Sequence, residues 1–183
     1  MSSFNLFNSL PNLITVARLI LVPVTIALIM SESWVAAFVV FAVAGISDAV
    51  DGFLAKRFKL QSELGAYLDP LADKTLLVSI YVTLAVLGVL PRTLAVLVVS
   101  RDLMIIGAVI ISWVLHRPVE IRPLPISKAN TVVQIILAGA ILGAKAFGIS
   151  ITPWLDVMVL LVATLTIASM TAYLAQWLKH MSS

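Results

Sequence analysis

The amino-acid sequence lacks cysteine and contains few histidines and few charged residues. Of its 183 residues none is cysteine, two are histidine and 11% are charged. The chain therefore has no disulfide framework, no thiolate metal site and no cysteine nucleophile. The formal net charge is only +3 and the basic residues are scattered, which argues against a nucleic-acid partner.

Apolar residues are correspondingly abundant. They make up 61% of the chain, and the mean hydropathy is +1.11, which is more than a soluble domain of this length needs. Six apolar stretches are each long enough to span a bilayer: residues 12–30, 33–55, 66–90, 92–116, 126–147 and 152–178. We predict an all-α integral membrane protein with six transmembrane helices in a single domain, residues 1–183. Residues 1–10 are expected to form a short interfacial segment.

The basic residues in the connections predict the orientation of these spans. One side would carry seven of them, namely Lys56, Arg57, Lys59, Arg117, Arg122, Lys128 and Lys179. The other side would carry Arg92 and Lys145. Cytoplasmic connections are enriched in lysine and arginine, so both termini and the loop between spans two and three are predicted to be cytoplasmic. The membrane would be a bacterial inner membrane or a mitochondrial inner membrane.

Four aspartates interrupt this apolar pattern within the stretch SDAVDGFLAKRFKLQSELGAYLDPLADK, residues 47–74. Asp48 and Asp51 fall at the cytoplasmic end of span two, and Asp69 and Asp73 at the cytoplasmic start of span three. Helical residues three or four apart share a face, at about 60° and about 40° respectively. Because consecutive spans joined by a short loop are expected to be antiparallel neighbours, the two acidic faces are predicted to meet.

Four facing carboxylates cannot all stay ionised at this depth without a cation. Each costs on the order of 3 kcal/mol at mid-membrane and less near the interface. Partial protonation is one solution and a bound metal is the other, while the simplest alternative is that the acids only mark helix ends. An all-oxygen ligand set, with both histidines far away in sequence, favours a hard cation such as Mg²⁺ or Mn²⁺ over Zn²⁺.

Small residues lie beside these acids. Gly52 follows Asp51 directly, Ala55 is one turn further along, and Gly65 lies four residues before Asp69. Missing side chains let a ligand or a partner helix approach the backbone closely. A glycine in a membrane helix is most often a packing residue, but this placement favours a nucleotide slot.

The pattern of aspartates, small residues and a lysine resembles the signature of the CDP-alcohol phosphatidyltransferase family. The matching residues read Asp-x-x-Asp-Gly-x-x-Ala-Lys from Asp48 to Lys56, then Gly65, Asp69 and Asp73 at the family spacing. The family usually has arginine where Lys56 stands, so the charge is kept but the bidentate fork for a diphosphate is lost.

The resemblance implies a six-helix homodimeric enzyme that moves a phosphatidyl group from CDP-diacylglycerol to an alcohol and releases CMP. It implies that Asp48, Asp51 and Asp69 hold the divalent metal. Asp73 would be the general base, in contact with a second metal. The remaining signature residues would bind nucleotide and diphosphate, and these are Gly52, Ala55, Lys56 and Gly65.

Later residues bear on the acceptor alcohol. Residues 100–106 (SRDLMII) and 125–134 (PISKANTVVQ) resemble the corresponding stretches of the eukaryotic-type cardiolipin synthases in that family. The resemblance therefore favours phosphatidylglycerol as acceptor, giving cardiolipin. The alternative is glycerol 3-phosphate, as in the phosphatidylglycerophosphate synthases, although those more often show Arg-Glu where Arg101-Asp102 stands.

Three other basic residues are candidate contacts for an acceptor phosphate: Arg101, Arg122 and Lys128. For Arg122 and Lys128 the alternative is a purely topological role, and for Arg101 it is ion pairing with other helices. Arg101 and Asp102 are adjacent and point about 100° apart on a helix, so we predict that they do not simply pair with each other.

Two other protein classes also place acids in membrane helices. A metal or proton transporter would more naturally place them near the midplane and show inverted repeats, and no repeat relates the two halves of this chain. An intramembrane prenyltransferase carries its aspartate motifs on well-separated helices of a longer chain. Here all four acids lie within residues 48–73.

Overall fold

The described part of the chain is almost entirely helical. The computed structural model describes the backbone of residues 6–58, 63–115 and 124–182, and the side chains of residues 17, 19–47, 74–115 and 124–181. These residues form six helices: α1 (Leu6–Met30), α2 (Trp34–Phe58), α3 (Glu63–Val86), α4 (Arg92–Val114), α5 (Pro125–Phe147) and α6 (Thr152–Ser182). The predicted all-α class with six helices is confirmed.

Two of the predicted boundaries differ from the structure for clear reasons. Helix α3 ends at Val86 and not at residue 90, because Gly88 adopts φ 72° and turns the chain towards Pro91, which precedes α4. The apolar run continues through this turn, so hydropathy alone missed it. Helix α1 begins at Leu6 and not at residue 12, while residues 1–5 lie outside the described part, so the interfacial position of residues 1–10 stays a prediction.

The ends of α5 follow from its sequence. Pro125 occupies the first turn, where its missing N–H is not needed. Gly148 caps the other end in the left-handed conformation, φ 65°, and its N–H bonds to the carbonyl of Ala144. The helix is therefore fixed between a proline and a glycine, at boundaries that match the predicted residues 126–147 closely.

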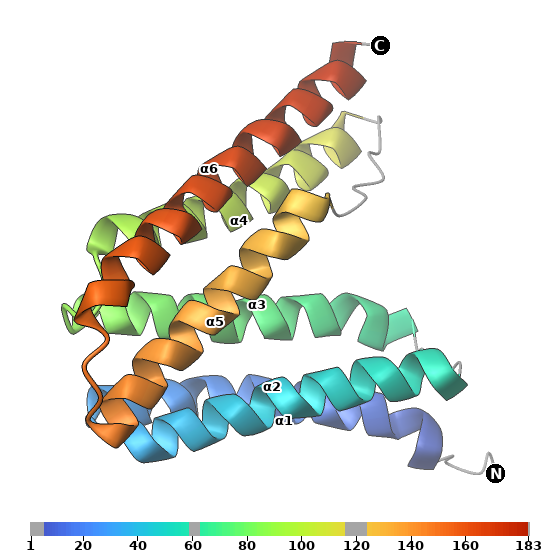
Figure 1. The fold of residues 1–183 in the computed structure, drawn as a ribbon. Coiled ribbons are helices and arrows are strands. Elements are labelled where there is room, and N and C mark those ends of the chain that lie inside the picture. Colours follow the sequence, from blue (N-terminus) through green and yellow to red (C-terminus); the bar gives the residue numbers. More distant parts are fainter. Residues whose placement is uncertain (1–5, 59–62, 116–123, 183) are drawn as a thin grey trace.

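The helices form two groups. In the first, α1 packs against both α2 and α3, and in the second, α4 packs against α6. Helix α5 connects the groups, because it contacts α6 on one side and α2 and α3 on the other. Figure 1 shows the two groups inclined to each other, with the start of α1 and the end of α6 at the same end of the bundle. Helices α2 and α4 end there too, and α3 and α5 begin there. The apolar core between the groups contains Ile80, Leu84, Leu137 and Leu142, all fully buried.

Small residues on α5 allow α2 to approach closely. A Cβ atom placed on Gly143 would lie 3.2 Å from Cε2 of Phe38, and one on Gly139 would lie 3.3 Å from Cε1 of Phe41. Phe38 also packs edge-to-face against Phe147, with ring centroids 5.7 Å apart. The α2–α5 contact thus depends on two glycines against two phenylalanines.

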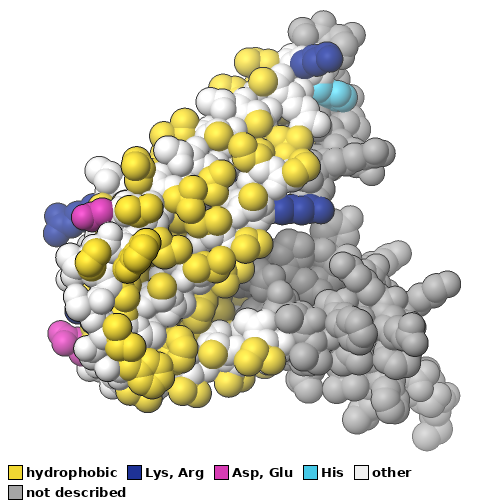
Figure 2. All heavy atoms as spheres, in the orientation of Figure 1, with side chains coloured by type: hydrophobic (Ala, Val, Ile, Leu, Met, Phe, Trp, Pro, Cys, Tyr) yellow, Lys and Arg dark blue, Asp and Glu magenta, His cyan; other side chains and the backbone are white. Residues whose placement is uncertain are grey.

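The outer surface is that of a membrane protein. Hydrophobic side chains cover the described face in Figure 2, and charged side chains lie mostly towards its ends. Helices α4, α5 and α6 contain segments long and apolar enough to cross a bilayer, Arg92–Val114, Pro125–Phe147 and Thr152–Met181. The described parts of α1, α2 and α3 are apolar helices that continue into segments whose side chains are not described.

The four tryptophans all lie near helix ends. Trp34 and Trp154 begin α2 and α6, whereas Trp113 and Trp177 lie near the ends of α4 and α6. Tryptophan is enriched at both membrane–water interfaces, so this distribution gives one aromatic belt at each end of the bundle.

Candidate active site

Arg101 of α4 is the centre of a polar cluster inside the bundle, where its side chain is 2% exposed. Its Nε and Nη2 donate to Oγ of Ser169 on α6 at 3.3 and 3.1 Å, and Nη2 also donates to Oγ of Ser127 on α5. The guanidinium lies 5.9 Å from the centre of the Tyr173 ring. A buried arginine needs such partners, and here they join α4 to α5 and α6.

Arg101 also pairs with its neighbour, contrary to our prediction. Nη1 donates to Oδ1 of Asp102 at 2.5 Å. The Cβ atoms do diverge, but the arginine side chain is long enough to turn back. The same Oδ1 accepts from Nζ of Lys74 on α3 at 2.8 Å, so Asp102 lies between two cations. Lys74 directly follows Asp73, and this ion pair thus ties the acid-bearing part of α3 to α4.

The predicted acceptor contacts fall in different surroundings. The guanidinium of Arg101 already donates to Asp102, Ser127 and Ser169, while Lys128 is exposed in the first turn of α5. Arg122 lies outside the described residues. The acceptor role of all three therefore stays a prediction.

The four aspartates belong to two consecutive helices. Asp48 and Asp51 lie in the C-terminal part of α2, and Asp69 and Asp73 in the N-terminal part of α3. Figure 1 shows α2 ending and α3 beginning at the same end of the bundle, the end at which α1 also begins and α6 ends. The side chains of these residues lie outside the described ones, as do those of Gly52, Ala55, Lys56 and Gly65. Their metal, base and diphosphate roles stay predictions.

Among the side chains that the structure describes, no three histidines or acids come together as a metal-binding group. The described part of the chain thus offers no second location for a metal. The four signature aspartates remain the donor set to be considered.

A chamber of about 390 Å³ opens beside the start of the described part of α3. One wall is apolar and comes mainly from α2, with Phe41, Ala44 and Gly45. Four polar side chains from α3, α4 and α5 also line it, namely Lys74, Asp102, Thr131 and Gln134. The chamber therefore combines a mainly apolar lining with a few polar groups, one of which belongs to the residue after Asp73.

Two buried amides on α5 lack a complete set of partners. Gln134 is 3% exposed and Asn130 is fully buried. Oδ1 of Asn130 accepts from Oγ1 of Thr166 at 3.1 Å, but neither Nδ2 of Asn130 nor Nε2 of Gln134 finds a partner within the described structure. Such unpaired donors are unusual in a native interior and call for an explanation.

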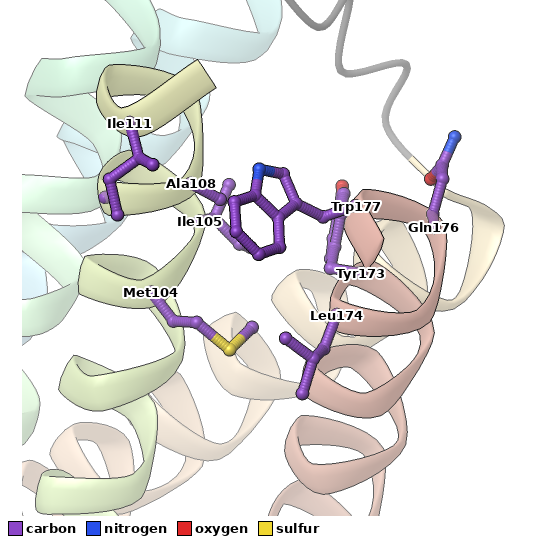
Figure 3. A pocket seen from close by; sticks show the side chains of 9 residues that line it. Met104, Ile105, Ala108, Ile111, Tyr173, Leu174, Gln176 and Trp177 are labelled. Atoms are coloured by element: carbon purple, nitrogen blue, oxygen red, sulfur yellow. The ribbon is translucent and has the colours of Figure 1, made fainter. Parts of the chain in front are cut away.

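A second, almost wholly apolar groove of about 250 Å³ lies between α4 and α6. In Figure 3, Trp177 reaches from α6 towards α4, and Met104 and Leu174 lie across the groove from each other. Nε1 of Trp177 donates to Oγ of Ser112 on α4 at 2.8 Å, which fixes the indole at one end. The groove suits hydrocarbon and offers little for a polar reaction.

Sequence reasoning missed Lys74, Gln134 and the two serines that bind Arg101. A signal for part of this set was present, since Ser127, Asn130 and Gln134 recur at helical spacing within an apolar span. Polar residues on the interior face of a membrane helix point to bonds with other helices or to a ligand. The pairing of Lys74 with Asp102, which are 28 residues apart, had no such signal.

The fold and these features define a polytopic helical membrane protein with a mainly apolar chamber that a few polar side chains line, beside the helix pair that carries the aspartates. The particular family follows from sequence comparison. The sequence model of the CDP-alcohol phosphatidyltransferase family matches residues 8–168, and the chain belongs to this family.

Several curated relatives are similar over most of the chain. The rat and human proteins named cardiolipin synthase (CMP-forming) are each 36% identical over 183 aligned residues, covering 90% of this chain and 60% of the relative. A rice protein is named chloroplastic CDP-diacylglycerol–glycerol-3-phosphate 3-phosphatidyltransferase 1. It is 37% identical over 186 residues, covering 91% of this chain and 56% of the relative. The chain thus spans little more than half the length of these relatives.

Proposed function

We propose that this protein transfers the phosphatidyl group of CDP-diacylglycerol to phosphatidylglycerol, forming cardiolipin and releasing CMP. The observation that carries the proposal is the family match over residues 8–168, which contains all four aspartates of the signature. The names of the rat and human relatives support phosphatidylglycerol as the acceptor.

The donor set fits a hard divalent cation, Mg²⁺ or Mn²⁺. Two helices each contribute two aspartates about one turn apart, and all the candidate ligand atoms are carboxylate oxygens. Asp48, Asp51, Asp69 and Asp73 would hold the metal. When bound, such an ion offsets the negative charge that builds up as a diphosphate is cleaved.

In the proposed reaction Asp73 takes the proton from a hydroxyl of the acceptor. The freed oxygen forms a bond to the phosphorus on the lipid side of the diphosphate, and the bond from that phosphorus to the CMP oxygen breaks. Gly52, Ala55 and Gly65 leave room for the nucleotide, and Lys56 provides positive charge beside the phosphates. A carboxylate crowded by like charges has the raised affinity for a proton that this step requires.

The site would face the cytoplasm, because the connections at that end carry most of the lysines and arginines. The lipid tails would stay in the bilayer while the diphosphate reacts near its surface. We also infer a homodimer, on the strength of the family resemblance alone. Chemical cross-linking in native membranes tests the dimer independently of activity.

The second candidate acceptor is glycerol 3-phosphate. The rice relative, whose name contains this substrate, covers as much of the chain as the animal proteins do. The product would then be phosphatidylglycerophosphate, and the same aspartates would serve.

A paired acceptor assay tests the proposal. Protein purified in detergent receives CDP-diacylglycerol and Mg²⁺ with either phosphatidylglycerol or glycerol 3-phosphate, and CMP release is followed over time. Release with phosphatidylglycerol alone is the expected result. Release with glycerol 3-phosphate alone would overturn the acceptor assignment, and release with neither acceptor would overturn the proposed activity.

A further inference from the structure

The chamber between α2, α3, α4 and α5 has polar groups that the reaction described above does not use. Lys74 lines the chamber and directly follows the proposed base, Asp73, in the sequence of α3. Its polar groups come from three helices and its α2 wall is apolar. A molecule with an apolar part and a polar part could place the first against the α2 wall and the second against these polar groups.

Gln134 is the least expected residue in the chamber. Its backbone carbonyl accepts from the hydroxyl of Tyr81 at 3.1 Å, which holds α5 against α3 at this level. Its side chain lines the chamber and is 3% exposed, yet within the described structure Nε2 has no hydrogen-bond partner. A leucine or methionine would fill the same space without an unpaired donor, so the amide is better explained by a ligand that accepts from it.

The charges in the chamber limit what this ligand is. Lys74 has three N–H donors, one of which goes to Asp102, and its side chain is 39% exposed. The carboxylate of Asp102 accepts from Lys74 and Arg101 through one oxygen and can accept further bonds from hydroxyls. An amide donor, a carboxylate acceptor and one accessible ammonium together suit a polyol that carries a single negative charge.

We propose that this chamber binds the glycerol hydroxyls of the acceptor, and that Gln134 contributes to acceptor binding by donating from Nε2 to one of these oxygens. The inference rests on the proposed function and deepens it. Glycerol hydroxyls are common to phosphatidylglycerol and glycerol 3-phosphate. The apolar α2 wall and the single accessible ammonium favour phosphatidylglycerol, a lipid with a singly charged phosphodiester, over glycerol 3-phosphate, which is a dianion.

The test compares Gln134→Met with the wild-type enzyme. Methionine conserves the volume but cannot donate, and we expect the KM for phosphatidylglycerol to rise about 3- to 10-fold for the loss of one hydrogen bond. The KM for CDP-diacylglycerol and the thermal stability should stay unchanged, a combination that a purely structural role would not produce. Gln176→Met, the same change at an exposed position on α6, is the matched control and should leave both KM values unchanged.

A second variant reaches the chamber from the opposite wall. A Cβ on Gly45 would meet nothing within 4 Å, so we expect Gly45→Val to fill chamber space and also to raise the KM for the acceptor. A well-folded Gln134→Met with an unchanged acceptor KM refutes the role of Gln134. If Gln134→Met does not fold, an unchanged acceptor KM in Gly45→Val refutes the chamber assignment.

The two proposals fail in distinguishable ways. Wild-type activity with phosphatidylglycerol, combined with unaffected variants, refutes the chamber and leaves the proposed function standing. If the wild-type enzyme uses only glycerol 3-phosphate, the proposed acceptor is wrong. In that case a raised KM for glycerol 3-phosphate in Gln134→Met supports the chamber, and an unchanged KM refutes it.

Discussion

The cluster around Arg101 allows a quantitative prediction about which of two paired charges matters more to stability. Arg101→Met removes a guanidinium that bonds to Ser127, Ser169 and Asp102. Hydrogen bonds between membrane helices contribute about 0.6 kcal/mol each on average, so the two serine partners on α5 and α6 give about 1 kcal/mol, while Asp102 lies on the same helix as Arg101. Asp102 would keep Lys74 as its counter-ion, and no charge would be left uncompensated.

The reverse substitution should cost more. Asp102→Leu leaves the guanidinium of Arg101, 2% exposed, without its carboxylate. Breaking a buried pair in this way typically costs about 3–5 kcal/mol, because an uncompensated charge stays buried. The double variant Arg101→Met/Asp102→Leu removes that charge, so it should be less destabilised than the sum of the two single variants.

Reversible unfolding in mixed detergent micelles measures these three free energies. We expect Asp102→Leu to lower the free energy of unfolding more than Arg101→Met does. The double variant should show a coupling energy of about 1 kcal/mol or more between the two sites. Strictly additive effects, or a larger loss for Arg101→Met, would refute the reasoning. Either result would mean that Arg101 gains little from its carboxylate and is stabilised mainly by the two serines.

Three further predictions concern packing and chemistry. Gly143→Ala should destabilise the protein by about 1–3 kcal/mol, because its Cβ would lie 3.2 Å from Phe38, whereas Gly107→Ala meets nothing within 4 Å and should be neutral or stabilising in the same unfolding assay. Asp73→Asn should retain CDP-diacylglycerol binding but lose turnover, and normal CMP release by this variant would rule out the base assignment. Asp51→Asn should raise the Mg²⁺ concentration needed for half-maximal activity, and an unchanged metal requirement would count against a ligand role.

The sequence predicted the number and class of the helices well but their ends less well. Six apolar runs are separated by polar or turn-forming residues, and bilayer thickness sets a minimum length that leaves few alternatives. The end of α3 was missed because Leu87, Val89 and Leu90 continue the apolar run, although Gly88 has already turned the chain. Hydropathy measures the preference for lipid and not the backbone conformation.

Side-chain partners were harder to predict than helices. The pairing of Arg101 with Asp102 was missed because the prediction used only the directions of the Cα–Cβ bonds. An arginine side chain is long enough to turn its guanidinium back towards the neighbouring residue. Lys74 seemed part of the signature stretch, and only the fold brings α4 close enough for it to reach Asp102. The four aspartates could be singled out as candidate site residues without knowledge of the fold, because the family signature depends only on residue spacing along the sequence.

These pairs also suggest how the proposed base, Asp73, would be held in position. On the C-terminal side of Lys74, α3 is held by apolar contacts, with Ile80, Tyr81 and Leu84 all fully buried. At Lys74 itself the ion pair to Asp102 adds a directional contact to α4, and Arg101 extends it to α5 and α6. Asp73 is thus one residue away from a point that is fixed on several sides. Proton transfer is sensitive to small errors in position, so the proposed base on α3 would gain from this anchoring, and the apolar α2 wall would be the side on which the proposed acceptor lies.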